Sequence, residues 1–177
     1  MTFQISNLDD LRRFSEQFVS LLRGGELFLL EGTLGAGKTT FVRAVSEAMG
    51  TKDNVCSPTF SLIQRYKSNK SLSIVHMDLY RLESDRELDF LDIEELLESD
   101  NIKFIEWGTK FSDYFEQSYI LIRLQAPDLD NSSEKESDLE LGEERTISFS
   151  IHNVQKEKTS LSVLFESLED CLKRFKI

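Results

Sequence analysis

Along the first fifty residues, the spacing of hydrophobic and polar positions switches between that of a strand and that of a helix. Residues 2–6 alternate as in a short strand, and an Asn7 N-cap precedes apolar residues at helical spacing that continue to Leu22. Residues 26–31 are a short, mostly apolar run typical of a strand buried on both faces, and residues 38–49 again follow helical spacing. This order of strand, helix, strand and helix predicts an α/β domain.

The middle of the chain predicts an antiparallel hairpin followed by an acidic helix. Residues 60–66 and 72–77 have strand composition, and the five polar residues between them are too few for a parallel crossover of about a dozen residues. Residues 83–100 have the composition of a helix. Its expected buried side consists of Leu88, Leu91, Ile93, Leu96 and Leu97.

Four further elements complete the predicted domain. Residues 103–107, 119–124 and 145–151 read as short strands, and residues 158–175 form a closing amphipathic helix. We find no repeat and no interdomain linker in residues 1–177. The expected architecture is a single α/β domain of three layers, in which a mixed parallel and antiparallel sheet is flanked by helices.

Composition narrows the class of protein. The 177 residues are 40% hydrophobic, include 13 Phe and carry a formal charge of −11. These values exclude a disordered chain, a disulfide scaffold and a basic nucleic-acid binder that acts alone. Cys56 and Cys171 have no metal-ligand spacing and favour reduced thiols over a disulfide. Without a secretory signal or an apolar run of about 20 residues, we expect a cytoplasmic protein with no membrane partner.

The acidic charge is concentrated in two segments. Residues 83–100 carry a net charge of −8 and residues 126–144 carry −7, which leaves +4 on the rest of the chain. We hypothesise that residues 83–100 face a partner protein and that residues 126–144 are a dispensable loop insertion. The alternative is that both segments are solvated surface.

One segment matches a nucleotide-binding motif at every fixed position. Residues 32–39 read GTLGAGKT and fit G-x-x-x-x-G-K-[ST] between a predicted strand and a predicted helix. In such a P-loop, backbone N–H groups surround a phosphate, the lysine reaches the β- and γ-phosphates and the hydroxyl binds Mg²⁺. A nucleoside triphosphate with Mg²⁺ is the implied ligand of such a P-loop NTPase domain. The expected nucleotide contacts are Gly32, Thr33, Gly35, Ala36, Gly37, Lys38, Thr39 and Thr40.

Two acidic residues at predicted strand ends are candidates for the magnesium site. A P-loop site requires a carboxylate opposite Thr39, and Glu106 and Asp78 each follow a short apolar strand. We rank Glu106 first as the metal ligand, with Asp78 as a second ligand or a water-positioning group. An alternative role for either carboxylate is a helix cap. Thr59, in the loop after the P-loop helix, is a candidate switch hydroxyl that senses the γ-phosphate.

The roles of two neighbouring side chains are open. For His76 we favour a hydrogen-bonded structural role over catalytic proton transfer. For Trp107, the only tryptophan, we favour packing in the core over a position covering the nucleotide site.

The motifs occur together in a known family. The matching segments are residues 34–41 (LGAGKTTF), 57–60 (SPTF), 76–81 (HMDLYR), 87–90 (ELDF) and 105–107 (IEW). In order and spacing these segments resemble the TsaE (YjeE) family. That family consists of bacterial P-loop ATPases needed to make N6-threonylcarbamoyladenosine at position 37 of tRNAs.

The resemblance implies roles for individual residues and for a partner. Lys38 would bind phosphate, Thr39 and Glu106 would hold Mg²⁺, and Asp78 would be required for hydrolysis. Thr59 would lie in a switch-like loop. By the same resemblance, Arg145 would match an arginine near the nucleotide. The chain would hydrolyse ATP weakly alone, act with the TsaB–TsaD pair, and reach tRNA only through that complex.

Two other functions are compatible with a P-loop. The first is a small-molecule kinase, which normally closes an arginine-rich lid over the transferred phosphoryl group. Between Glu106 and the acidic 126–144 segment only Lys110 and Arg123 are basic, which argues against such a lid. The second is a nucleotide-binding module whose hydrolysis is vestigial.

Overall fold

The computed structural model describes residues 1–68, 72–126, 144–152 and 160–176. These residues form a seven-stranded sheet with the spatial order β1-β7-β6-β2-β5-β4-β3. The strands are β1 (Thr2–Ile5), β2 (Leu27–Glu31), β3 (Ile63–Lys67), β4 (Ser73–Asp78), β5 (Ile102–Glu106), β6 (Tyr119–Gln125) and β7 (Arg145–His152).

The centre of the sheet is parallel and its two edges are antiparallel. Strand β2 pairs in parallel with β5 and β6, and β4 pairs in parallel with β5. Strand β3 pairs antiparallel with β4, as the short connection between them predicted. On the other side β7 pairs antiparallel with both β6 and β1. The predicted α/β class with a mixed sheet is therefore confirmed.

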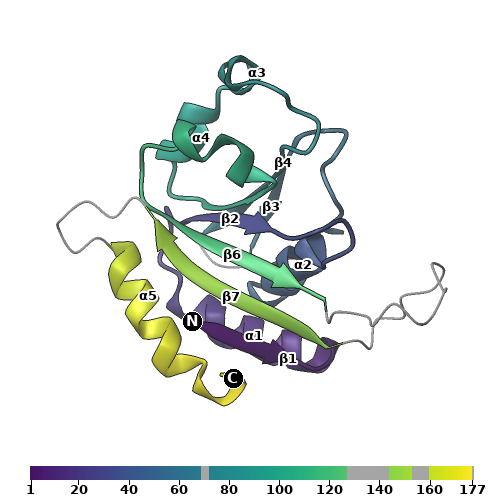
Figure 1. Ribbon diagram of the computed structural model, residues 1–177, viewed down its shortest axis with the longest axis vertical. Helices are drawn as coiled ribbons and strands as arrows, with labels where there is room; N and C mark the ends of the chain where they lie inside the picture. Colours follow the sequence, from purple (N-terminus) through teal and green to yellow (C-terminus); the bar gives the residue numbers. More distant parts are fainter. Residues whose placement is uncertain (69–71, 127–143, 153–159, 177) are drawn as a thin grey trace.

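Helices cover both faces of the sheet and make three layers (Figure 1). One face carries α1 (Leu8–Leu21), α2 (Lys38–Ala48) and α5 (Ser160–Cys171), and the short η2 (Lys173–Phe175) follows α5. The other face carries α3 (Asp85–Asp89), α4 (Ile93–Glu98) and η1 (Gly108–Tyr114).

Alternation along the strands divides the apolar side chains between the two faces. In β2, Phe28 and Leu30 join the cluster under α1, α2 and α5, whereas Leu27 and Leu29 join the cluster under α3, α4 and η1. A strand buried on both sides therefore has the continuous apolar sequence that residues 26–31 show.

Phenylalanine rings fill the larger of the two clusters. Phe18 of α1 is fully buried, and the centre of its ring lies 5.3 Å from that of Phe28, 5.8 Å from that of Phe41 and 6.0 Å from that of Phe149. These contacts join α1, β2, α2 and β7. The packing fixes α2, the P-loop helix, against the sheet.

Two sequence predictions of local structure are wrong in detail. Strand β3 begins at Ile63 rather than residue 60, because Leu62 donates its N–H to Pro58 O at 2.6 Å in a tight turn and has a positive φ of 63°. Phe60 is consequently 85% exposed instead of lying in a strand.

The acidic segment 83–100 forms two short helices rather than one. Leu88 and Ile93 are both buried against the sheet, and on one continuous helix they would point about 140° apart. A break at Asp92, whose φ is 49°, lets both side chains reach the core. Of the other expected apolar positions Leu96 is buried, whereas Leu91 and Leu97 are partly buried.

The structure tests several expectations about the chain as a whole only in part. Cys56 and Cys171 are free thiols. Within the described residues, no helix is long and apolar enough to cross a membrane. Apart from its two end residues, the acidic segment 126–144 lies outside the described part of the chain, so its role as an insertion stays a prediction.

The packing of Phe18 predicts its contribution to stability. We expect Phe18→Ala to lower the free energy of unfolding by roughly 3–5 kcal/mol, because it leaves a cavity between helix and sheet. Urea denaturation followed by circular dichroism measures this change. The matched control is Phe90→Ala, since Phe90 is 86% exposed and its loss should change stability by less than about 0.5 kcal/mol. Equal effects of the two substitutions would contradict this packing.

Candidate functional site

The P-loop runs from the end of β2 to the start of α2, as its sequence predicts. Gly32 has a φ of 152°, and a Cβ on it would lie 2.5 Å from Leu124 O and 2.9 Å from the Ala36 Cβ. The loop can therefore pass this close to β6 only with glycine at this position. Gly37 has a φ of 98° and immediately precedes α2, so the first N–H groups of the helix face the loop without a capping side chain.

Lys38 folds back across the loop that precedes it. Its Nζ donates hydrogen bonds to Gly32 O at 2.8 Å and to Thr33 O at 3.0 Å. Burial lowers the pKa of Lys38 below its ordinary value, and the nearby carboxylates of Glu106 and Asp78 oppose that shift. A cation held in this way is placed to meet a phosphate bound inside the loop.

Trp107 lies over Lys38 of the P-loop, so the prediction that it packs in the core is wrong. The Lys38 Nζ is 4.2 Å from the centre of the indole ring, and the centre of the Tyr80 ring is 5.1 Å from that of the indole. Trp107 has a left-handed backbone conformation with a φ of 62° directly after β5. This turn directs the indole toward Lys38, and no local sequence signal identifies such a conformation at a tryptophan.

Glu106 joins the end of β5 to the start of α2. Its Oε1 accepts a hydrogen bond from the Thr39 hydroxyl at 2.7 Å and lies 2.9 Å from His76 Nε2. A threonine that donates its proton to a carboxylate keeps its oxygen lone pairs available for a cation. The pair therefore has the donor set and orientation expected of a magnesium site in a P-loop protein.

Asp78 occupies the equivalent position on the neighbouring strand. It is the register partner of Glu106, and both side chains are almost completely buried. Its Oδ2 accepts hydrogen bonds from the Thr59 hydroxyl and from Ser57 Oγ, the latter at 3.1 Å, while its Oδ1 accepts from Tyr80 N at 3.0 Å. The structure thus brings the hydroxyl of Thr59, the predicted switch residue, to the carboxylate of Asp78. It also brings Ser57 to this carboxylate, a residue that the sequence analysis did not single out.

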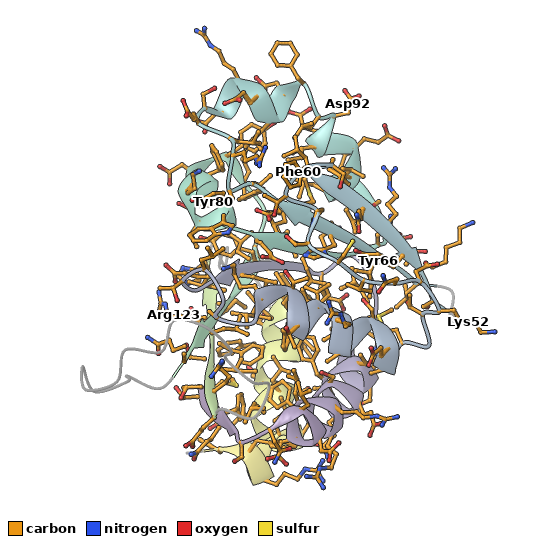
Figure 2. All side chains as sticks on the ribbon, turned by 90° about the vertical axis from the view of Figure 1, so that its right-hand side faces the viewer. Lys52, Phe60, Tyr66, Tyr80, Asp92 and Arg123 are labelled. Carbon is orange, nitrogen blue, oxygen red and sulfur yellow. The ribbon has the colours of Figure 1, made fainter. Side chains whose placement is uncertain are left out.

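The carboxyl ends of the parallel strands meet at one side of the molecule. Figure 2 labels Tyr80, which follows β4, and Arg123 of β6 on the same side, whereas Lys52 and Tyr66 lie on the opposite side. Ligands of open α/β sheets bind at this carboxyl-end side.

A small pocket of about 140 Å³ lies beside the P-loop on the side of α1 and β7. Its lining residues are Ile5, Asn7, Leu8, Leu11, Gly35, Ala36, Gly37, Thr40, Leu124, Arg145 and Ile147. The structure places the predicted contacts Thr40 and Arg145 here. The apolar residues from α1 and β7 were missed, since only the folded chain brings them next to the P-loop.

The protein side chains alone do not complete a metal site. Among residues 1–68, 72–126, 144–152 and 160–176, no group of three His, Cys, Asp or Glu side chains is arranged to hold a metal ion. Mg²⁺ commonly binds through one or two carboxylates together with substrate phosphates and water. Thr39, Glu106 and Asp78 therefore fit a cation that arrives with a nucleotide.

Comparisons with known proteins agree on one family. Residues 5–136 match the family described as threonylcarbamoyl adenosine biosynthesis protein TsaE. The tRNA threonylcarbamoyladenosine biosynthesis protein TsaE of Haemophilus influenzae is 33% identical over 129 residues, covering 70% of this chain and 81% of its own. The protein of the same name from Aquifex aeolicus is 41% identical over 101 residues, covering 56% of this chain and 70% of its own.

A solved structure agrees with the fold. The crystal structure of Bacillus subtilis YdiB superimposes with a TM-score of 0.70 and 22% identity, covering 96% of this chain and 94% of the other. With the sequence relationships above, the resemblance from short motifs is confirmed. The chain belongs to the TsaE family, which takes part in tRNA threonylcarbamoyladenosine biosynthesis.

Proposed function

We propose that the chain binds ATP with Mg²⁺ and hydrolyses it as the ATPase subunit of the machinery that makes N6-threonylcarbamoyladenosine at position 37 of tRNAs. The observation that carries the proposal is the 2.7 Å hydrogen bond from the Thr39 hydroxyl to Glu106 at the mouth of a P-loop. In this role the chain works with the TsaB–TsaD pair and reaches tRNA only through that complex.

Each site residue has a distinct task in the proposed reaction. Lys38 and the N–H groups at the start of α2 bind the phosphates, and Thr39 and Glu106 hold Mg²⁺, with Asp78 as a direct or water-mediated ligand. Mg²⁺ held by these residues would supply positive charge beside the phosphates. Trp107 covers Lys38 and keeps water from its ammonium group.

Asp78 connects the reacting end of the nucleotide to the loop that carries Thr59. The Oδ2 of Asp78 is occupied by two hydroxyls, whereas Oδ1 accepts one described protein donor and retains capacity for a water molecule. We infer that Asp78 orients the attacking water through Oδ1. Movement of Thr59 toward a γ-phosphate would then alter the hydrogen bonds of Asp78.

The small pocket beside the P-loop is the proposed site of the adenine base. It adjoins Gly35, Gly37 and Thr40, on the side of the loop away from Lys38 and Trp107, and Leu8, Leu124 and Ile147 give it apolar walls. An aromatic base binds such walls by burying its faces. Arg145 at the rim can pair with a phosphate or with the ribose.

The basic residues after β5 favour hydrolysis over a small-molecule kinase activity. Lys110 Nζ donates to Tyr80 O at 2.9 Å and Leu82 O at 2.8 Å. Arg123 Nε pairs with Glu31 Oε2 at 2.6 Å. Both cations are therefore committed to the fold and cannot close as a lid over a transferred phosphoryl group without losing these contacts.

Substitutions at the P-loop and at the strand end should have different effects. We expect Lys38→Ala to reduce ATP hydrolysis by about 10²-fold or more, because it removes the cation that contacts the phosphates. Glu106→Gln should reduce Mg²⁺-dependent turnover by roughly 10–100-fold while leaving Mg²⁺-free ATP binding nearly unchanged. Phosphate release and calorimetric titration in EDTA measure the two quantities. Normal turnover of Lys38→Ala would remove the basis for the proposal, and a vestigial module would show no turnover even with TsaB and TsaD.

The proposed base pocket is tested by a charge at its rim. We expect Leu8→Glu to weaken ATP binding by roughly tenfold, equivalent to about 1.4 kcal/mol, because a carboxylate would replace apolar contact beside a polyanion. The matched control is Val163→Glu on α5, since Val163 is 51% exposed and Leu8 is 44% exposed. Calorimetric titration of both variants with ATP measures the difference. Unchanged affinity in Leu8→Glu would place the base elsewhere.

Trp107 provides a spectroscopic test of the same site. A triphosphate bound at Lys38 should change the emission of this single tryptophan, since its ring lies 4.2 Å from the lysine nitrogen. We expect a saturable change on titration with Mg-ATP that is lost in Lys38→Ala. Adenosine, which has the base but no phosphate, is the control ligand and should give little change. An emission spectrum insensitive to Mg-ATP under saturating conditions would contradict this placement of the phosphates.

A further inference from the structure

We propose that His76 is a positioning residue for Glu106, an inference that rests on the proposed Mg²⁺-dependent ATPase function. His76 lies on β4 with 0% of its surface exposed, and its Nε2 is 2.9 Å from Glu106 Oε1. The contact places the imidazole against the carboxylate of Glu106, through which it would act.

The path of the two strands explains how the ring reaches Glu106. His76 is the register partner of Phe104, and Asp78 is the register partner of Glu106. Because side chains two residues apart share a face, the His76 ring and the Glu106 carboxylate both lie on the α2 side of the sheet. The imidazole of β4 therefore reaches the carboxylate that lies two residues beyond its register partner on β5.

The hydrogen-bond partners define the tautomer that this contact requires. An ionised carboxylate only accepts hydrogen bonds, so His76 must carry its proton on Nε2 when it binds Glu106. The opposite nitrogen, Nδ1, is buried without a hydrogen-bond partner among the described residues. Burying an unpaired ring nitrogen is unfavourable, and an apolar side chain would fill the same space without that cost. The position therefore uses histidine for its Nε2–H group.

Two donors on one oxygen set the orientation of the carboxylate. Glu106 Oε1 receives the Thr39 hydroxyl from α2 and the His76 N–H from β4. With Oε1 fixed by both, Oε2 is the oxygen left to face a cation or its water. Loss of His76 would leave Thr39 as the single described side-chain donor, so the carboxylate would rotate more freely.

The test uses two amide variants that differ in reach. His76→Gln places an amide N–H near the position of Nε2, whereas the shorter His76→Asn cannot reach Glu106 Oε1. We expect His76→Asn to lower Mg²⁺-dependent phosphate release, or to raise the Mg²⁺ concentration needed for half-maximal release, by roughly 10–100-fold. His76→Gln should recover most of that loss. Affinity for ATP in EDTA should stay within about twofold of the unmodified chain in both.

A double substitution separates positioning from a general structural role. If His76 acts through Glu106, adding His76→Asn to Glu106→Gln should cause little further loss of Mg²⁺-dependent turnover. Should His76→Asn not fold, His76→Leu supplies the donor-free variant in the same comparison, with urea denaturation reporting stability.

Three results would overturn the inference. They are multiplicative losses in the double variant, equal activities of the Gln variant and the donor-free variant, and a parallel loss of Mg²⁺-free ATP binding. Absence of Mg²⁺-dependent hydrolysis in the unmodified chain would instead refute the proposed function, and His76 would lose its role with it.

Discussion

The hydrogen bond between the Thr39 hydroxyl and the Glu106 carboxylate connects the two halves of the site. Thr39 belongs to the first turn of α2 and Glu106 to the end of β5, so the 2.7 Å contact requires helix and strand to be held in fixed relation. Parallel pairing with β2 fixes the position of β5 in the sheet. The phenylalanine cluster around Phe18, which includes Phe41 of α2, fixes that helix against the sheet. The packing of the helices on the sheet thus holds this one polar contact in place.

The same region shows how polar groups enter strands that are otherwise apolar. His76, Asp78 and Glu106 are buried on the face covered by α2, each at an even step from an apolar residue of the same strand. Hydrogen bonds with neighbouring side chains and backbone groups compensate most of the free-energy cost of burying these three side chains. Among the described residues, Nδ1 of His76 has no hydrogen-bond partner, and an unpaired group of this kind is expected where a site rather than stability determines the residue.

Local signals in the sequence predicted what depends on neighbouring residues, and contacts between distant segments determined the rest. The P-loop, the strand-end acids and the hairpin follow from spacing and short-range geometry, and the structure has all three, although β3 begins three residues later than predicted. The left-handed turn at Trp107 places its ring against Lys38, and the break at Asp92 lets both Leu88 and Ile93 pack against the sheet, so these two features depend on segments far away in the chain. The exposure of Phe60 follows instead from the tight turn between Pro58 and Leu62, which the apolar pattern of residues 60–66 did not reveal. The apolar pocket likewise combines α1, the P-loop and β7, which no single segment encodes.

The most direct test of the account is multiple-turnover modification of tRNA by TsaB and TsaD with this chain added. The reaction contains ATP and Mg²⁺, and N6-threonylcarbamoyladenosine is counted per complex. We predict that modification continues over many turnovers with the unmodified chain and stops after about one turnover without it or with Lys38→Ala. Equal multiple-turnover modification in the absence of the chain would contradict the account.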